Sequence, residues 1–334
     1  MPHRRVEEEI AQLADVCRSG ITPAALAALR KALKDRINLM VAKAAKLAGH
    51  LHAADLTPDL VAAFDRLMEK PVERDPQCWG KTAIAETLVA LDYREPALFL
   101  RGARHIQMEA AYIRPADTAE VLRGICILAL PACQGLGRAE ILRCLVDGLT
   151  EKASNVRLEA VRAIAQMEGP EAAPVLRLKA RVGDPESAVT GQVFDALTRL
   201  EGADALSFLA GFLRSNNAET RDEAALALGA SRLPAAVAAL REALEAARDR
   251  SFREVLMRAL SASRQAEAIE CLLDLLRHGR PADASVALAA LEVHRETLAI
   301  WALVEAARPA SIRSAPIEEE TVDEQADEAE EDES

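Results

Sequence analysis

A basic side chain recurs at one repeating position along the chain, and a carboxylate often precedes it. The basic residues at this position are Lys81, Arg123, Arg157, Arg221 and Arg253. Acids stand six residues before four of the corresponding sites, at Asp75, Asp117, Glu151 and Asp184, the last of which precedes Thr190 in place of a base. A row of cations on one wall can track the phosphates of a nucleic acid. Alternatively, the opposite charges tie neighbouring elements together and cap helix starts.

The ladder of ion pairs is the favoured interpretation, because acids on the same segments would interrupt the path of an anionic ligand. These acids are Glu86, Glu159, Asp195, Asp222, Glu223 and Glu254. Two further arginines, Arg162 and Arg258, recur at equivalent positions without an acid at a fixed spacing. They are the best candidates for contacts with a partner on the concave face. The candidate partner-binding residues of this surface are Arg162, Arg258, Arg123, Arg157, Arg221 and Arg253.

Residues that could bind a metal or act as nucleophiles do not assemble into a recognisable site. His50 and His52, with Asp55 nearby, have the spacing of a weak metal site only in a strand or loop. At a helix end, a histidine instead complements the helix dipole. No Ser or Cys is paired with a plausible His, and the segment 135–137 is too short for a phosphate-binding glycine loop. The sequence therefore predicts no catalytic residue, no metal and no cofactor.

The six cysteines include no CxxC pair. Cys126, Cys133 and Cys144 could form a redox or metal cluster. Most of the cysteines stand among Leu, Ile and Ala, however, where a free thiol behaves as a small buried hydrophobe. We therefore expect reduced cysteines in a cytoplasmic protein. The chain also lacks a secretory signal pattern, and its most apolar short run, residues 125–133, is too short to cross a bilayer.

The elements that carry all these side chains repeat along the sequence. Aligning the last apolar residue of each unit produces the column Leu47, Leu88, Leu130, Ile164, Leu197, Leu228, Leu260 and Leu291. The residue before it is Ala in six of the eight units. Twelve residues after the column stand Leu100, Leu142, Leu176, Leu209, Leu240, Leu272 and Leu303. Apolar residues also recur every three or four residues within a unit, which is typical of amphipathic helices.

Each unit is predicted to be a helical hairpin, because Gly and Pro turn signals separate its two columns. A hairpin cannot bury its apolar face alone, so neighbouring hairpins must stack into a continuous core. The small Ala lets helices approach closely, which also explains why only ten of the 334 residues are aromatic. We predict an all-α fold, an α-α superhelix (solenoid) of about eight hairpins over residues 1–310 that begins with a capping helix.

The pattern Asp/Asn-x-x-x-Val-Arg-x-Glu-Ala-x-x-Ala-Leu-Gly, followed by Pro-Glu-Ala-x-x-x-Leu, resembles the HEAT repeat of the armadillo-like superfamily, in its phycobilisome-lyase-type subclass. The best matches run from Asn155 to Leu176 and from Asn216 to Leu244, and the resemblance covers about residues 20–308. The first two units are longer than is usual for the family. The resemblance implies a solenoid, but it does not imply one function, because the repeat serves many unrelated tasks.

Three further functions occur among HEAT-like proteins. The bilin lyase role that the subclass suggests needs a tetrapyrrole groove, which the sequence does not identify. HEAT-repeat iron hydroxylases carry His-Glu dipeptides, and this chain has none. HEAT-like DNA glycosylases imply aromatic residues in a basic groove, whereas Trp79 and Trp301 stand at opposite ends of the array. We predict a non-enzymatic scaffold that binds a protein or peptide along a concave face. The alternatives are a nucleic-acid-binding or repair protein, which is less favoured, and a lyase-like enzyme.

An insertion at residues 106–116 lengthens the region between the second and third units. Insertions in solenoids emerge on one face, which is often the binding face. Tyr112, Ile113 and Arg114 suit an interface hot spot, so Tyr112 and Arg114 join the candidate partner-binding residues. The alternative is a longer helix or a turn without a binding role.

The net charge of −12 is concentrated at the C-terminus. Residues 318–334 hold eleven carboxylates and no Lys or Arg, so the remainder has 41 basic and 42 acidic residues, a net charge of −1. Residues 311–334 are predicted to be a disordered acidic tail that aids solubility, docks a basic partner or folds onto the N-terminus. The first fifty residues hold nine Lys or Arg and five acids, which indicates a solvated capping face or a small patch for an anionic partner.

Overall fold

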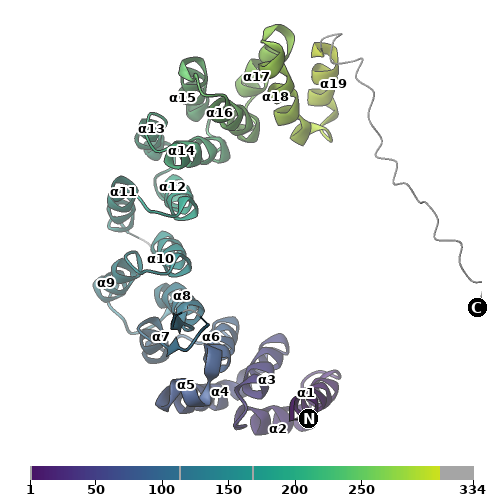
Figure 1. Ribbon diagram of the computed structural model, residues 1–334, viewed down its shortest axis with the longest axis vertical. Helices are drawn as coiled ribbons and strands as arrows, with labels where there is room; N and C mark the ends of the chain where they lie inside the picture. The colour runs from purple at the N-terminus through teal and green to yellow at the C-terminus, as the bar shows by residue number, and fades with distance from the viewer. Residues whose placement is uncertain (1, 113, 168, 309–334) are drawn as a thin grey trace, which may run out of the picture.

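The chain folds into a curved stack of helical hairpins that forms an open arc (Figure 1). The computed structural model describes residues 2–112, 114–167 and 169–308. Two helices, α1 (Pro2–Cys17) and α2 (Pro23–Leu33), pack together at the N-terminal end, where the sequence predicted one capping helix. The predicted tail at residues 311–334 lies outside the described residues.

Within the described residues eight hairpins follow, and each consists of a helix of an inner row and the next helix along the chain in an outer row (Figure 1). The inner row consists of α3 (Asn38–His50), α6 (Trp79–Ala90), α8 (Glu120–Ala129), α10 (Ser154–Gln166), α12 (Ser187–Glu201), α14 (Ala218–Ala230), α16 (Arg250–Ser263) and α18 (Pro281–Leu291). The outer row consists of α4 (Thr57–Glu69), α7 (Pro96–Ala103), α9 (Arg138–Gly148), α11 (Ala172–Val182), α13 (Ala203–Phe212), α15 (Pro234–Ala246), α17 (Ala266–His278) and α19 (Leu298–Ala307). The predicted all-α superhelix of about eight hairpins is confirmed.

Short elements connect some of these helices. The α5 helix (Pro71–Arg74) lies between α4 and α6. Single 3-10 turns occupy Ala54–Leu56, Pro76–Cys78, Leu130–Ala132 and Glu292–His294. Among the described residues, no helix is both long and apolar enough to cross a membrane.

The inner helices pack closely because small residues lie between them. The Ala residues that precede the apolar column are buried at Ala129, Ala163, Ala196, Ala227, Ala259 and Ala290. Between α14 and α16 the approach is closer still, because a Cβ added to Gly229 would overlap the backbone oxygen of Ala259. Helix layers this thin leave little room for rings, so Leu and Ala form most of the core.

The inner column is buried from α6 onward, whereas the outer column varies, and its residues Leu100 and Leu142 are only half-buried. Leu88 and the six column residues that follow it, as far as Leu291, are buried, but Leu47 is half-buried, and Ala48 takes the buried position in α3. In the outer row, Leu303 is 48% exposed, while the adjacent Val304 is buried against the core. The terminal helix has a neighbour on only one side, so fewer of its apolar residues can be covered.

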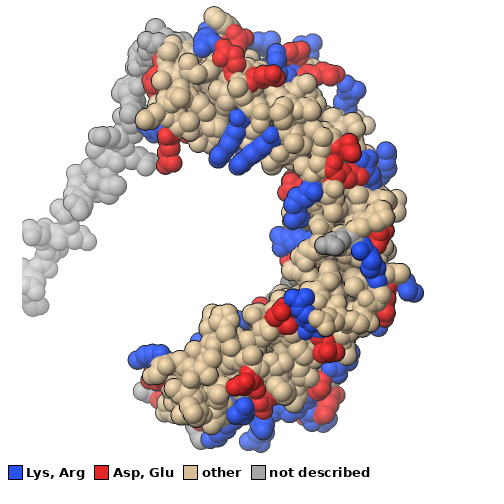
Figure 2. Space-filling model, turned by 180° about the vertical axis from the view of Figure 1, so that it is seen from behind, with Lys and Arg blue, Asp and Glu red and all other residues tan. Residues whose placement is uncertain are grey.

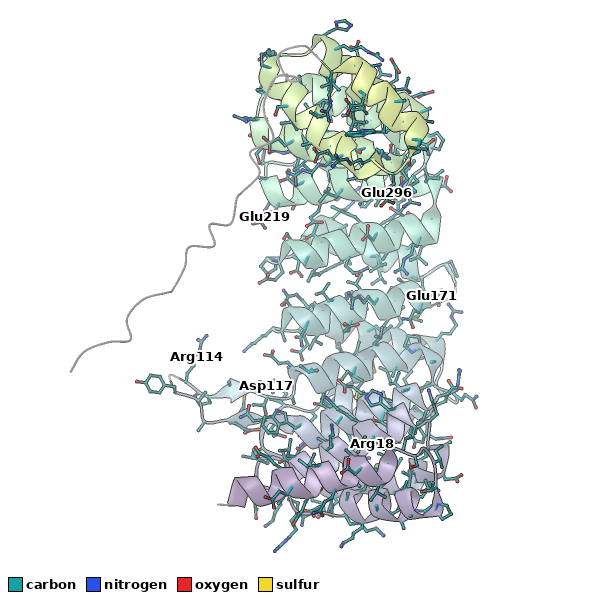
Figure 3. The ribbon with its side chains drawn as sticks, turned by 90° about the vertical axis from the view of Figure 1, so that its right-hand side faces the viewer. Arg18, Arg114, Asp117, Glu171, Glu219 and Glu296 are labelled. Atoms are coloured by element: carbon teal, nitrogen blue, oxygen red, sulfur yellow. The ribbon has the colours of Figure 1, made fainter. Side chains whose placement is uncertain are left out.

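The insertion forms a short β-hairpin, where the sequence had indicated a binding segment or a helix or turn. Strand β1 (Met108–Glu109) pairs antiparallel with β2 (Ala116–Asp117), with Met108 opposite Asp117 and Glu109 opposite Ala116. The hairpin leads directly into α8. It projects beyond the edge of the inner row, as the positions of Arg114 and Asp117 show in Figure 3.

Candidate functional site

One side chain on each inner helix faces the concave side of the arc. These residues stand two positions before the buried residue of the inner column, which is Ala48 in α3, and are Lys46, Glu86, Leu128, Arg162, Asp195, Leu226, Arg258 and Ala289. Two residues along an α-helix correspond to a rotation of about 200°, so these side chains point away from the core. The row mixes both charges with apolar residues. Basic and acidic side chains are likewise interspersed on the face shown in Figure 2.

The larger hollow of this surface measures about 650 Å³ and runs along α8 between α6 and α10. Its floor is apolar and consists of Val121, Gly124, Ile125, Leu128, Ala129 and Ala132. The wall from α6 carries Glu86 and Val89, and the wall from α10 carries Glu159. Val89 and Val121 are each about half-exposed, at 46% and 53%. We call this hollow the α8 groove.

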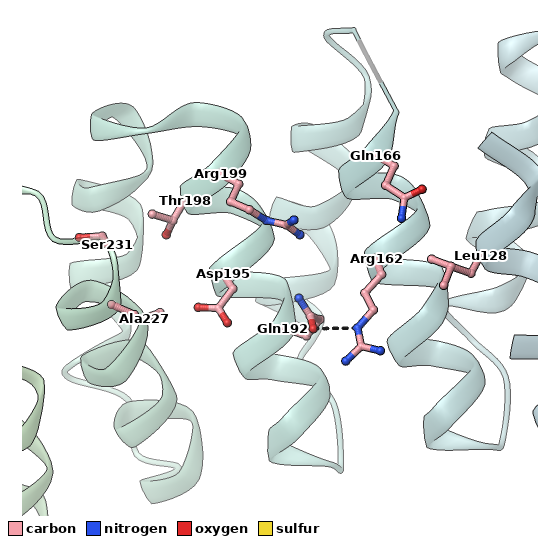
Figure 4. Close-up of a pocket in the computed structure, with 10 residues that line it drawn as sticks. Leu128, Arg162, Gln166, Gln192, Asp195, Thr198, Arg199, Ala227 and Ser231 are labelled. Carbon is pink, nitrogen blue, oxygen red and sulfur yellow. Dashed lines mark hydrogen bonds between the residues drawn. The ribbon is translucent and has the colours of Figure 1, made fainter. Parts of the chain in front are cut away.

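A second hollow of about 510 Å³ adjoins the α8 groove and shares Leu128 and Gln166 with it (Figure 4). We call it the α12 hollow. It is more polar, and its charged lining residues are Arg162, Asp195 and Arg199. The Arg162 guanidinium donates from Nε to Gln192 Oε1 at 3.1 Å and from Nη1 to Glu159 Oε1 at 2.8 Å. These bonds hold Arg162 across the boundary between the two hollows.

Two carboxyl groups at or near the α12 hollow have a pKa above the ordinary value. Burial raises the pKa of Asp195, against the opposing effect of Arg199. Burial also raises the pKa of Glu223, and the neighbouring carboxylates of Asp195 and Asp222 raise it further. Glu223 lies against Gly191 of α12, where an added Cβ would overlap its carboxylate. The carboxyl groups of Asp195, Asp222 and Glu223 therefore lie close together on the neighbouring helices α12 and α14.

The recurring basic residues form ion pairs between hairpins, as the ladder interpretation predicts. Arg157 binds both carboxylate oxygens of Asp184, at 2.8 Å from Nε and 2.8 Å from Nη2, and so ties α10 to the start of the next hairpin. Burial alone would raise the pKa of Asp184, but hydrogen bonds from Arg157 and Lys179 lower it below the usual value. The same ladder continues with Arg123–Glu151 at 3.6 Å, Arg221–Asp249 at 3.0 Å and Arg253–Asp283 at 3.1 Å.

Two of the arginines predicted to bind a partner are buried in the ladder, so the prediction is corrected for them. Arg123 is 3% exposed and lies 2.7 Å from Asp117, while Arg157 is also buried, so neither side chain can reach a partner on the surface. Arg221 and Arg253 are partly exposed at the edge of the inner row, but both are engaged by the next hairpin. Arg221 also stacks over the Phe252 ring at 4.2 Å.

Arg162 and Arg258 lie on the concave face as predicted, and their partner-binding role stays a prediction. The sequence offered no acid at a fixed spacing from them, and each arginine instead has an acidic neighbour at its own spacing on the same helix. Arg162 binds Glu159 at 2.8 Å, and Arg258 lies 3.9 Å from Glu254 on its own helix. Both side chains remain about half-exposed or more, and Arg258 lines a small hollow with Ala289. These intrahelical contacts are weak enough to be exchanged for a partner's groups.

The β-hairpin presents Tyr112 fully to solvent, and Arg114 is also exposed, whereas the predicted hot-spot residue Ile113 lies outside the described residues. The root of the hairpin is anchored by a buried polar network in which Gln107, which no sequence pattern marks, joins Asp75 and Lys81 of the ladder. Lys81 Nζ lies 3.1 Å from Asp75 Oδ2 and donates to Gln107 Oε1 at 2.8 Å, and Gln107 Nε2 donates to the Asp75 backbone oxygen at 2.8 Å. Tyr112 and Arg114 are therefore carried on a fixed support.

The histidines and cysteines occupy structural positions. His50 ends α3, as predicted, and His52 follows it with a positive φ of 51°. Cys126 is buried, and burial raises the pKa of its thiol, while burial raises that of Cys133 to about 11. Across the part of the chain that the structure describes, no three His, Cys, Asp or Glu side chains are grouped to hold a metal ion.

The apolar floor of the α8 groove was missed as a candidate site, although the sequence held a signal for it. Residues 125–130 are apolar without interruption, whereas a helix that buries one face carries polar residues on the other. The excess apolar side chains of this run, Ile125 and Leu128, lie on the concave face.

The matches to family models lie in the middle of the chain. Residues 156–178 match the PBS lyase HEAT-like repeat, and residues 177–261 match HEAT repeats. No curated protein matches the chain. Among solved structures, human deoxyhypusine hydroxylase in complex with glycerol is 21% identical, with a TM-score of 0.30 over 76% of this chain and 88% of that chain. One engineered protein is 19% identical, with a TM-score of 0.37 over 89% of this chain and 87% of that chain. A second engineered protein is 17% identical, with a TM-score of 0.24 over 84% of this chain and 96% of that chain.

Proposed function

We propose that this chain, which is a HEAT-repeat protein of the PBS-lyase-like subclass, is a non-enzymatic scaffold that binds a protein partner along its concave face. The observation that carries the proposal is the continuity of the α8 groove and the α12 hollow, which share Leu128 and Gln166. Concave surfaces that combine exposed apolar groups with a few polar side chains are the usual sites of partner binding.

The charge pattern of the concave row favours a protein over a nucleic acid. Glu86 and Asp195 stand in the same row as Lys46, Arg162 and Arg258, so a polyanion lying along the row would meet both signs. A protein surface can match such a pattern residue by residue. A titration of the full chain with DNA and RNA separates the two functions, because binding that weakens steeply with salt would support the nucleic-acid alternative.

Photo-crosslinking from defined positions tests the proposed function. A benzophenone amino acid is placed at Gln166, which both hollows share, and in a control at Leu178, which is exposed on α11 in the outer row. Illumination in an extract of the source cells should produce a discrete protein adduct from Gln166 and none from Leu178. Adducts from Leu178 alone would contradict binding along the concave face.

A further inference from the structure

We infer that the α8 groove binds an amphipathic helix of the partner whose apolar stripe is flanked by Lys or Arg. This inference rests on the proposed function, and it adds the chemistry of the bound segment. The groove is distinct from the α12 hollow in having an apolar floor with acidic walls.

The dimensions of the groove suit a helix. Its lining runs along α8 from Val121 in the first turn to Ala132 just beyond the last, which corresponds to about 16 Å, or three helical turns. The walls α6 and α10 flank α8 on either side, so their axes are separated by two interhelical distances, roughly 16–20 Å. A helix with its side chains has a diameter of about 10–12 Å, so a helix lying lengthwise over α8 reaches the side chains of both walls.

The chemistry of the floor favours a helix over an extended segment. The backbone groups of α8 are engaged within their own helix, and the floor presents aliphatic side chains such as Val121, Ile125 and Leu128. An extended peptide would bury its own N–H and C=O groups against these side chains without partners. A helix satisfies its backbone internally and offers apolar side chains at positions i, i+3, i+4 and i+7.

The charges around the groove indicate a basic partner. Its lining residues include three carboxylates, Glu86, Asp92 and Glu159, and one guanidinium, Arg94, which is paired with Asp92 at 2.7 Å. The lining therefore carries a net charge of −2, with Glu86 on one wall and Glu159 on the other. Glu159 accepts a bond from Arg162 through Oε1, while its buried Oε2 has no hydrogen-bond partner among the described residues.

The acidic C-terminal segment of this chain has the wrong charge for the groove. Its eleven carboxylates between residues 318 and 334 would be repelled by Glu86 and Glu159. A helix with basic residues on both sides of an apolar stripe instead places one cation near each wall. We therefore assign the groove to a segment of another protein.

Two synthetic helices test the assignment against the full chain. Each has about 18 residues, or five turns, with Leu at the i, i+3, i+4 and i+7 positions and capped ends. One carries Lys beside the stripe, and the other carries Glu at the same positions. By fluorescence anisotropy at low salt, the Lys peptide should bind about tenfold more tightly than the Glu peptide, and added salt should reduce this difference. Equal or tighter binding of the Glu peptide, or binding of neither, would overturn the inference.

Substitutions locate the binding surface and separate packing from charge. Val121→Lys, on the exposed floor, should weaken the Lys peptide at least tenfold, while Val182→Lys, exposed on α11, should leave it unchanged. Glu86→Lys should narrow or reverse the preference between the two peptides. Equal losses from Val121→Lys and Val182→Lys would show that the peptide binds elsewhere. Each variant is checked by its circular dichroism melting curve, so a misfolded protein is not counted.

Failure of this inference and failure of the proposed function are distinguishable. If Gln166 crosslinks a partner protein but neither peptide binds, the concave scaffold stands and the basic helix is wrong. If Gln166 gives no adduct but the Lys peptide binds the groove, the chemistry of the groove stands, and the broader claim of a partner along the whole concave face fails.

Discussion

Replacing Lys81 by Met should destabilise the fold and loosen the β-hairpin that carries Tyr112. The Lys81 ammonium lies 3.1 Å from Asp75 Oδ2, and both side chains are completely buried. Met keeps the length and the apolar stem of Lys but removes its charge and its hydrogen bond to Gln107. The Asp75 carboxylate would still accept hydrogen bonds, including one from the backbone N–H of Gly80 at 2.7 Å. It would lose the Lys81 ammonium, the only buried cation paired with it among the described residues.

The loss of stability on removing one member of an ion pair depends more on the burial of the pair than on the distance between its charges. Removing one partner of a buried ion pair costs about 3–5 kcal/mol, because the other charge is left uncompensated. The Arg214–Glu242 pair is shorter, at 2.7 Å, but its side chains are 82% and 71% exposed. Such surface pairs contribute less than about 1 kcal/mol. Arg214→Met is therefore the matched control for Lys81→Met.

Urea unfolding measures the loss in global stability, and amide hydrogen exchange at Gln107 and Thr118 reports on the hairpin, whose root contains these groups. We expect Lys81→Met to lower the free energy of unfolding by about 3 kcal/mol or more and to accelerate exchange at both amides. The double variant Asp75→Asn/Lys81→Met should lose less than the two single variants summed. The reasoning is refuted if Lys81→Met and Arg214→Met cost the same, or if hairpin exchange does not change.

Three further predictions compare positions that differ in one physical respect. Leu228→Asp buries an unpaired charge and should lower the free energy of unfolding by about 3–5 kcal/mol. Leu226→Asp, two residues away on the exposed concave row, should change it by less than about 0.5 kcal/mol. Similar losses for the two variants in urea unfolding would contradict the assignment of Leu228 to the core. Burial and neighbouring carboxylates raise the pKa of Glu223, so its contribution to stability is full below the ordinary Glu pKa and is lost as pH rises through the raised value. Glu223→Gln should therefore raise the melting temperature at neutral pH and lose that advantage in acid. A stabilisation that does not depend on pH would contradict this cause. Gly229→Ala should destabilise the protein by about 1–3 kcal/mol, because the added Cβ overlaps the backbone of α16. Gly211→Ala, with open space around the added Cβ, should stabilise it by about 0.4–1 kcal/mol. If thermal unfolding shows that both variants change stability in the same direction, α14 and α16 do not approach as closely as described.

The repeat architecture could be predicted from the sequence because one physical requirement recurs in every hairpin. Leu228 and its equivalents must be buried at a fixed position, and the adjacent Ala must admit the next helix, so both signals repeat along the chain. The ladder was predictable for the same reason. Arg157 and Asp184 occupy repeating positions, and the ion pair between hairpins follows from stacking.

The parts that could not be predicted depend on contacts that occur once. Gln107 binds Asp75, 32 residues away, and no periodic pattern marks such a pair. The displacement of the buried position from Leu47 to Ala48 arises from local packing at the end of the stack. On the concave face, Ile125 and Leu128 resemble core residues in sequence, and only the stacking of the helices shows that they line a groove.

Binding along the concave face is tested most directly by the dissociation constant of the protein crosslinked from Gln166, measured for substitutions on the two rows of helices. Leu226→Asp and Arg258→Glu change exposed concave residues, and Leu178→Asp changes an exposed residue of the outer row. We predict that the two concave substitutions weaken binding at least tenfold with unchanged melting temperatures, while Leu178→Asp has no effect. Loss of binding with Leu178→Asp alone, or equal affinity for all three variants, would contradict the account.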